Sequence, residues 1–247
     1  MGEGYDLVPK PLEVGMAYLQ PTLFGVVYAS RLFREAYDPS SYRDFVMKTA
    51  PTLDLGNVSH GKELLKWLNK LGCRIDENRF PELSSQLTKW FAEQSLPSVD
   101  IDLAELGDSS FDQLMLAYES LRNCGLGPTR AAKALFAVRP RCAIPWDESI
   151  RTEFKLPENG RGYRDMLKLS RQEEILLVED ANRCGIADIP KAVGGAAHDT
   201  LAKLLDEYHW ITISVGHQIP LPSELERWTS WHPGKPRQIE MLPNVNP

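Results

Sequence analysis

The sequence predicts an all-α, mainly helical protein, and three observations support that fold class. Apolar residues recur every three or four positions in successive segments, which is the spacing of one buried helix face. The composition, with 43% hydrophobic and 25% charged residues, is that of a soluble globular protein. Only residues 212–215 suggest a short strand. Helices are therefore expected to dominate the 247 residues.

Four helices are expected in the first part of the chain, at residues 30–36, 41–49, 60–72 and 81–93. The third is the clearest, because Leu64, Leu68 and Leu71 share one face and Gly72 supplies a C-terminal stop. Prolines and glycines punctuate residues 1–30, and a polar connection is expected at residues 95–110.

The second part of the chain is predicted to be helical at residues 110–123, 128–138, from about 147, 163–184 and 197–209. Pro128 suits the first turn of a helix, where its missing N–H is not needed. Six prolines fall within residues 218–247, which predicts a separate Pro-rich tail. The whole chain, residues 1–247 with the tail included, is expected to form a single unit.

Several classes of protein are excluded by what the sequence lacks. No apolar run approaches the roughly 18 residues of a membrane helix, and no signal peptide is readable, so we expect a cytoplasmic protein without a membrane partner. The four cysteines form no C-x-x-C pair and the five histidines no H-E-x-x-H motif. The sequence therefore predicts neither a metal site nor a cofactor.

Charge is distributed unevenly along the chain. The formal net charge is −6, but residues 122–155 hold seven basic against three acidic side chains, a local charge of +4. A basic stretch in an acidic protein can bind a polyanion, because fields act over a Debye length of about 8–10 Å. A solvated helix face is the alternative interpretation of the same charges.

Within this stretch, Gly125-Leu126-Gly127 separates two of the predicted helices. Glycines at both positions permit positive φ and a tight hairpin. The amides at the start of the second helix can then bind a phosphate, aided by Arg130 and Lys133 in its first two turns. No strand precedes the glycines and no Gly-Lys-Ser/Thr ending follows, so neither a dinucleotide fingerprint nor a Walker loop is present.

The segment from residue 111 to residue 151 resembles the helix-hairpin-helix DNA glycosylase superfamily. Members carry a Gly-hydrophobic-Gly hairpin and, about twenty residues after its second glycine, a catalytic aspartate. Asp147 follows Gly127 at that distance, behind the approach Ile144-Pro145-Trp146. The resemblance implies a two-lobed helical fold, double-stranded DNA as the partner and a protein that acts as a monomer.

The resemblance also implies roles for individual residues. Asp147 would stabilise the oxocarbenium character of the sugar as the N-glycosidic bond breaks, and Trp146 and Tyr118 would line the pocket for the flipped base. The bifunctional members place a lysine where this chain has Thr129, so a monofunctional reaction is implied. The expected DNA-binding residues are Gly125, Gly127, Thr129, Arg130, Lys133, Arg139, Arg141 and Arg151.

Alternatives remain open at this point. Asp147 suits a helix N-cap, and helical apolar spacing makes Tyr118 a core residue as readily as a pocket residue. The leading function is a monofunctional DNA glycosylase that removes a damaged or modified base. Alkylated purines, uracil and oxidised bases are all open as substrates, and the leading specific candidate is a glucosylated cytosine of phage DNA, with bacterial defence as the role. The alternative is a non-catalytic helix-hairpin-helix module that only binds DNA.

Overall fold

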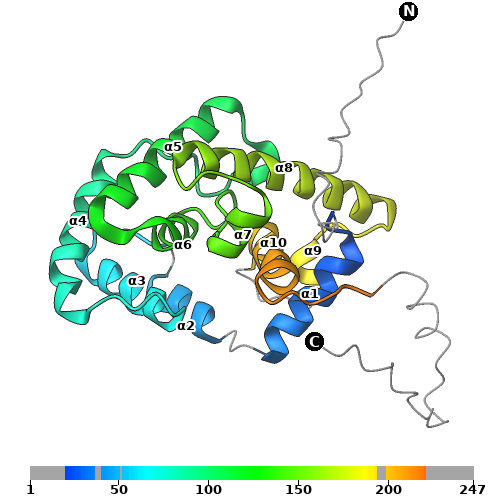
Figure 1. The fold of residues 1–247 in the computed structure, drawn as a ribbon, viewed down its shortest axis with the longest axis horizontal. Helices are drawn as coiled ribbons and strands as arrows, with labels where there is room; N and C mark the ends of the chain where they lie inside the picture. Colours follow the sequence, from blue (N-terminus) through cyan, green and yellow to red (C-terminus); the bar gives the residue numbers. More distant parts are fainter. Residues whose placement is uncertain (1–19, 37–39, 51, 194–198, 221–247) are drawn as a thin grey trace, which may run out of the picture. The chain divides into compact units, whose positions relative to one another are not determined.

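The computed structural model describes residues 20–36, 40–50, 52–193 and 199–220 (Figure 1). These residues form ten α-helices and four shorter 3₁₀ or π turns, and none of them lies in a strand. The prediction of an all-α fold is therefore confirmed. Among the described helices, none is both long enough and apolar enough to cross a bilayer.

The helices follow one another in the chain, and the 3₁₀ and π turns lie between or after them. The first five are α1 (Leu23–Ala36), α2 (Ser40–Lys48), α3 (Val58–Lys70), α4 (Phe80–Glu93) and α5 (Asp108–Leu121). The next five are α6 (Pro128–Val138), α7 (Glu148–Glu153), α8 (Gly160–Arg183), α9 (Ile189–Ala192) and α10 (Leu201–His209). The shorter turns are η1 (Glu77–Arg79) and η2 (Leu103–Glu105), which are 3₁₀, and η3 (Arg122–Leu126) and η4 (Trp210–Ser214), which are π.

The strand expected at residues 212–215 is wrong. Residues 212–214 belong to η4, which continues α10 without a break, and Val215 is its C-cap with helical φ and ψ. Thr212 donates its hydroxyl to the carbonyl oxygen of Tyr208 at 2.7 Å, and Ile211 is buried. Packing of Ile211 and the hydrogen bond to α10 outweigh the preference of β-branched residues for strands.

Side-chain caps set several helix ends that periodicity places only roughly. Asn159 caps α8 by accepting from the Gly162 N–H, and Thr200 caps α10 by accepting from the Lys203 N–H. The helix expected from residue 197 thus starts at Leu201, and residue 197 itself lies outside the described residues. The first helix starts at Leu23, seven residues before the expected position.

Contacts divide the chain into two units, Met1–His217 and Gln218–Pro247. All ten α-helices belong to the first unit. Only residues 218–220 of the second unit are described, so the predicted tail lies almost wholly outside the described residues.

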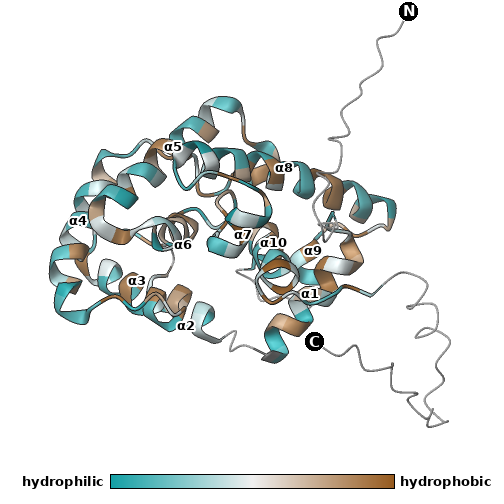
Figure 2. Cartoon of the chain, viewed as in Figure 1, coloured by the Kyte–Doolittle hydropathy of each residue, from teal (hydrophilic) through white to brown (hydrophobic). Residues whose placement is uncertain are grey.

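The core of the first unit is built from pairs of helices, α3 on α4, α5 on α8 and α1 on α10. Hydrophilic and hydrophobic residues are interspersed along these helices (Figure 2). The buried residues of α3 and α8 recur every three or four positions, as expected for helices that pack one face on a core. Rings from three helices meet where Phe45 stacks on Trp67 at 4.8 Å between centroids, beside Tyr42 and Phe136. This packing fixes α6, the second helix of the predicted hairpin, against α2 and α3.

A carboxyl group is buried where η2 packs against α8. Glu174 is 1% exposed, and its Oε1 accepts from the Ala104 N–H at 3.3 Å. Burial raises the pKa of Glu174 to about 8, the Ala104 N–H and Arg141 oppose the rise, and Asp102 and Glu105 add to it. The folded protein therefore keeps a proton here that the unfolded chain releases above its ordinary pKa, near 4.5.

Stability is expected to fall as the pH rises from about 4.5 to about 8, because the unfolded chain binds fewer protons in that window. Replacement Glu174→Gln removes this titration, so its free energy of unfolding should exceed that of the wild type by roughly 1–3 kcal/mol at pH 9. Urea unfolding from pH 5 to pH 9 measures the difference. Glu179→Gln, an exposed change on the same helix, is the control. Parallel curves for Glu174→Gln and wild type would show that Glu174 is ionised in the folded protein.

Candidate functional site

The expected hairpin lies between α5 and α6. The chain leaves α5 through the π turn η3, in which Gly125 has φ 85° and ψ 13°, and Gly127 follows with φ 73° and ψ 174°. Residues with a side chain disfavour both of these backbone conformations. The conformation of Gly127 is adopted almost exclusively by glycine. Helix α6 begins at Pro128 with no side chain capping its first turn. Its N-terminal end thereby presents backbone amides rather than a cap.

Two basic side chains of α6 reach the end of α3. Arg130 donates from Nε to the carbonyl oxygen of Cys73 at 2.8 Å, and Lys133 donates from Nζ to that of Leu71 at 3.3 Å. Cations are favourable near the C-terminus of a helix, where carbonyl groups lack partners. The structure therefore uses Arg130 and Lys133 to join α6 to α3.

The basic residues after α6 anchor the segment that leads to Asp147. Arg139 donates from Nε to the carbonyl oxygen of Pro97 at 2.5 Å, and Arg141 pairs with Asp102, also at 2.5 Å. Farther along, the hydroxyl of Tyr163 donates to the carbonyl oxygen of Ile144 at 3.0 Å. The segment is therefore held by residues that precede it in the chain (Pro97 and Asp102) and by one that follows it (Tyr163). These contacts fix the position of Asp147.

Three aromatic rings form a buried cluster beneath this segment. Trp146 is 1% exposed and Tyr118 is fully buried, and the indole Nε1 of Trp146 donates to the hydroxyl of Tyr118 at 3.2 Å. The ring of Tyr163 stacks on that of Tyr118 with centroids 4.3 Å apart. Burial raises the pKa of Tyr118 to about 12. A flipped base can stack on Trp146 or Tyr118 only if this cluster opens.

Asp147 stands at the start of α7 and is half-buried. Its Oδ1 accepts from the backbone N–H of Ile150 at 2.9 Å, so Asp147 is the N-cap of this helix. Its Oδ2 accepts from the hydroxyl of Ser214 on η4 at 2.7 Å. The carboxylate is therefore oriented by one donor on each oxygen.

Arg151 links the aspartate's helix to the hairpin. It lies one turn after Asp147, is 7% exposed, and pairs with Glu158 at 2.9 Å. Its Nη1 contacts the Thr129 hydroxyl oxygen at 3.5 Å, and its guanidinium lies over the Trp146 ring, 5.5 Å from the centroid. Arg151 thus contacts Thr129 and Trp146, and it is joined to Asp147 by the helical bond from its backbone N–H to the Asp147 carbonyl oxygen at 3.1 Å. Arg130, Lys133, Arg139 and Arg141 bind partners elsewhere in the protein.

The contact of Ser214 with Asp147 is a feature of the site that the sequence did not predict. Ser214 lies 67 residues from Asp147 in the chain, in the segment expected as a strand, and no motif marks it. Among the described residues, no three His, Cys, Asp or Glu side chains are grouped so as to hold a metal ion. Comparisons with family models, with curated proteins and with solved structures found no match for the chain.

Proposed function

We propose that the protein is a monofunctional DNA glycosylase with Asp147 as its catalytic carboxylate. The observation that supports this most is the link from α7, the helix that Asp147 caps, to the start of α6 through Arg151 and Thr129. This link ties the helix that the half-buried Asp147 caps to a helix end that is suited to a phosphate. The proposal includes the two-lobed arrangement of the superfamily that the segment resembles.

Each oxygen of the Asp147 carboxylate keeps a free lone pair in this proposal. An ionised carboxylate offers about four acceptor sites, of which the Ile150 N–H and the Ser214 hydroxyl occupy two. As the bond from sugar to base breaks, positive charge develops on the sugar, and a fixed anion stabilises it. The same group can orient or deprotonate the attacking water. Thr129 supplies no amine, so no Schiff base forms there.

The hairpin is proposed to hold the DNA backbone mainly through its amides. The long side chains of Arg130 and Lys133 already bind carbonyl groups of the protein, whereas the first turn of α6 carries no side-chain cap. Backbone N–H groups at a helix N-terminus bind phosphate with the help of the helix dipole. The affinity for DNA then depends on the conformation of the two glycines.

Replacement Gly127→Ala is expected to weaken DNA binding and to lower the free energy of unfolding by about 1–3 kcal/mol, because an L side chain disfavours this backbone conformation. Gly185→Ala is the matched control, since Gly185 has φ 71° and a Cβ at either glycine would meet no atom within 4 Å. The control should lose stability but not DNA affinity. Fluorescence anisotropy with a labelled duplex and urea unfolding measure the two effects. Unchanged DNA affinity in Gly127→Ala would exclude the hairpin as the phosphate site.

As the substrate we propose a modified cytosine of phage DNA, with a glucosylated base as the specific case and bacterial defence as the role. The test incubates the protein with phage DNA carrying such bases, with the same DNA unmodified, and with duplexes containing uracil, alkylated or oxidised bases. Abasic sites are then cleaved with an abasic endonuclease and the strand breaks counted. Breaks only in glucosylated DNA support the specific substrate, and breaks in another duplex reassign it.

A DNA-binding module without catalysis is the second candidate, and the capping contact of Asp147 with Ile150 favours it. A structural cap needs no chemistry, so the module predicts salt-dependent binding to duplex DNA with no abasic product from any base. Binding at several salt concentrations beside the break assay separates the two functions.

A further inference from the structure

The turn that carries Ser214 differs from the helix it extends. In η4 the N–H of Val215 donates to the carbonyl oxygen of Trp210, five residues back, at 2.9 Å. Such π turns are wider than α-helical turns, are rare, and occur often at functional sites. The wider turn rotates Ser214 relative to the faces of α10, and its hydroxyl meets Asp147.

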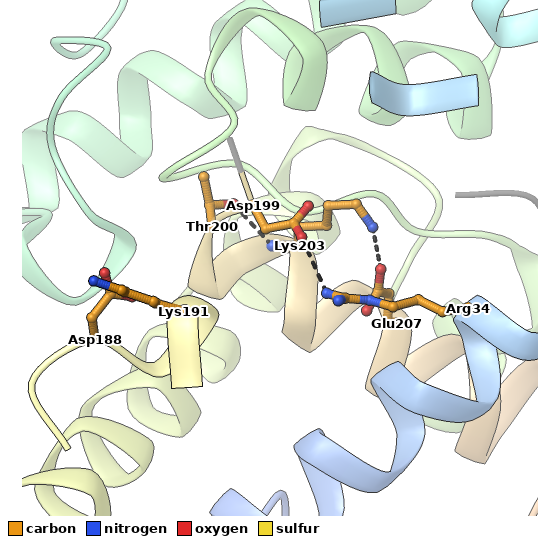
Figure 3. A network of polar contacts seen from close by, with 7 residues as sticks. All are labelled: Arg34, Asp188, Lys191, Asp199, Thr200, Lys203 and Glu207. Carbon is orange, nitrogen blue, oxygen red and sulfur yellow. Dashed lines mark hydrogen bonds and ion pairs between the residues drawn. The ribbon is translucent and has the colours of Figure 1, made fainter. Parts of the chain in front are cut away.

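Helix α10 holds this turn in a fixed place. At its N-terminal end the Thr200 hydroxyl donates to the carbonyl oxygen of Pro140 at 2.6 Å, and Asp199 pairs with Arg34 of α1 at 3.1 Å (Figure 3). Within the helix, Lys203 forms an ion pair with Glu207, and both side chains are buried. Pro140 belongs to the segment that leads to Asp147, so α10 is tied to the same part of the chain at both ends.

The two donors to Asp147 therefore come from different parts of the fold. Ile150 belongs to α7, the aspartate's own helix, whereas Ser214 comes from η4. One donor on one oxygen leaves a carboxylate able to turn about its Cβ–Cγ bond, and a second donor on the other oxygen fixes its plane. Contacts between α7 and η4 support this second donor.

We propose that Ser214 is a positioning residue for the reaction, which sets the plane of the Asp147 carboxylate through its hydroxyl. This inference rests on the proposed glycosylase function. Ser214 acts through Asp147 and does not itself contact the substrate. Removal of its hydroxyl leaves the capping bond from Ile150 and releases the rotation of the carboxylate.

The test compares Ser214→Ala, Ser214→Thr and Thr212→Val in single-turnover excision and in DNA binding. Thr212→Val is the matched control, because Thr212 lies on the same turn and donates its hydroxyl to Tyr208 instead of Asp147. Ser214→Ala should slow excision by about 10- to 100-fold, since misplacing a reacting group by about 1 Å can cost a factor of about 100. Its dissociation constant for DNA should stay within about twofold, because the phosphate contacts lie elsewhere. Ser214→Thr should restore most of the rate and Thr212→Val should retain it.

Excision by Ser214→Ala at the wild-type rate, or equal losses in Ser214→Ala and Thr212→Val, would overturn the positioning role while leaving the glycosylase function intact. A wild-type protein that excises no base would instead remove the proposed function, and the positioning role with it. In that event a double-mutant cycle of Asp147→Asn and Ser214→Ala in urea unfolding still measures the contact itself. Coupling between the two changes would then assign the contact to folding alone.

Discussion

Replacement Asp147→Asn is expected to slow base excision by about 10²- to 10⁴-fold, the range lost when a general base or a charge-stabilising group is removed. The asparagine keeps an oxygen that can accept from the Ile150 N–H, so the N-cap of α7 remains. It lacks the negative charge that stabilises the sugar cation. Single-turnover excision, followed by alkaline cleavage of the abasic strand, measures the loss.

The same variant should bind duplex DNA as the wild type does, because the hairpin amides are unchanged. Glu148→Gln, an exposed change at the next residue, is the control for loss of a negative charge near the site and should retain its rate. Full excision by Asp147→Asn would mean that another group performs the chemistry. Equal losses in both variants would mean that the local charge, and not this carboxylate, is what matters.

Replacement Trp146→Ala is expected to lower the free energy of unfolding by about 3–5 kcal/mol, as for other buried large aromatic residues. The indole fills the space beside Tyr118 and Tyr163, donates to the Tyr118 hydroxyl and lies under the Arg151 guanidinium. Its loss leaves a cavity and removes the support of the segment before Asp147. Urea unfolding at neutral pH measures the change.

Tyr118→Phe is the milder companion, since it removes only the hydroxyl that accepts from Trp146, and should cost on the order of 1 kcal/mol. A Trp146→Ala protein as stable as the wild type, but with weakened binding to DNA that contains a modified base, would contradict the core role. It would show instead that the ring lines an open base pocket, as the family resemblance implies.

The presence of most helices could be predicted from apolar spacing, because a helix must bury one stripe of residues. Leu64 and Leu68 of α3 are buried as that spacing requires. The ends were less predictable, because a cap such as Asn159 or Thr200 is a single residue whose effect depends on local geometry. The strand prediction for residues 212–215 was wrong because β-branched residues also fit a turn that is held by tertiary packing.

The candidate site was predictable where it is local in sequence. The hairpin glycines and the position of Asp147 at a helix start follow from residues 125–148 alone. The partners of the basic side chains do not, because sequence gives a charge but not the carbonyl group that accepts from it. Arg130 binding the end of α3 and Ser214 binding Asp147 both depend on distant segments that meet only in the folded chain.

The claim that Asp147 breaks the bond between sugar and base is tested most directly by looking for the released base. Mass spectrometry of the small-molecule fraction, after incubation with glucosylated phage DNA and with the panel of damaged duplexes, detects it. We predict that the wild-type protein releases one free base for each abasic site and that Asp147→Asn releases at most about a hundredth as much in the same time. Tight, salt-dependent binding to these duplexes with no free base from any of them would contradict the proposal.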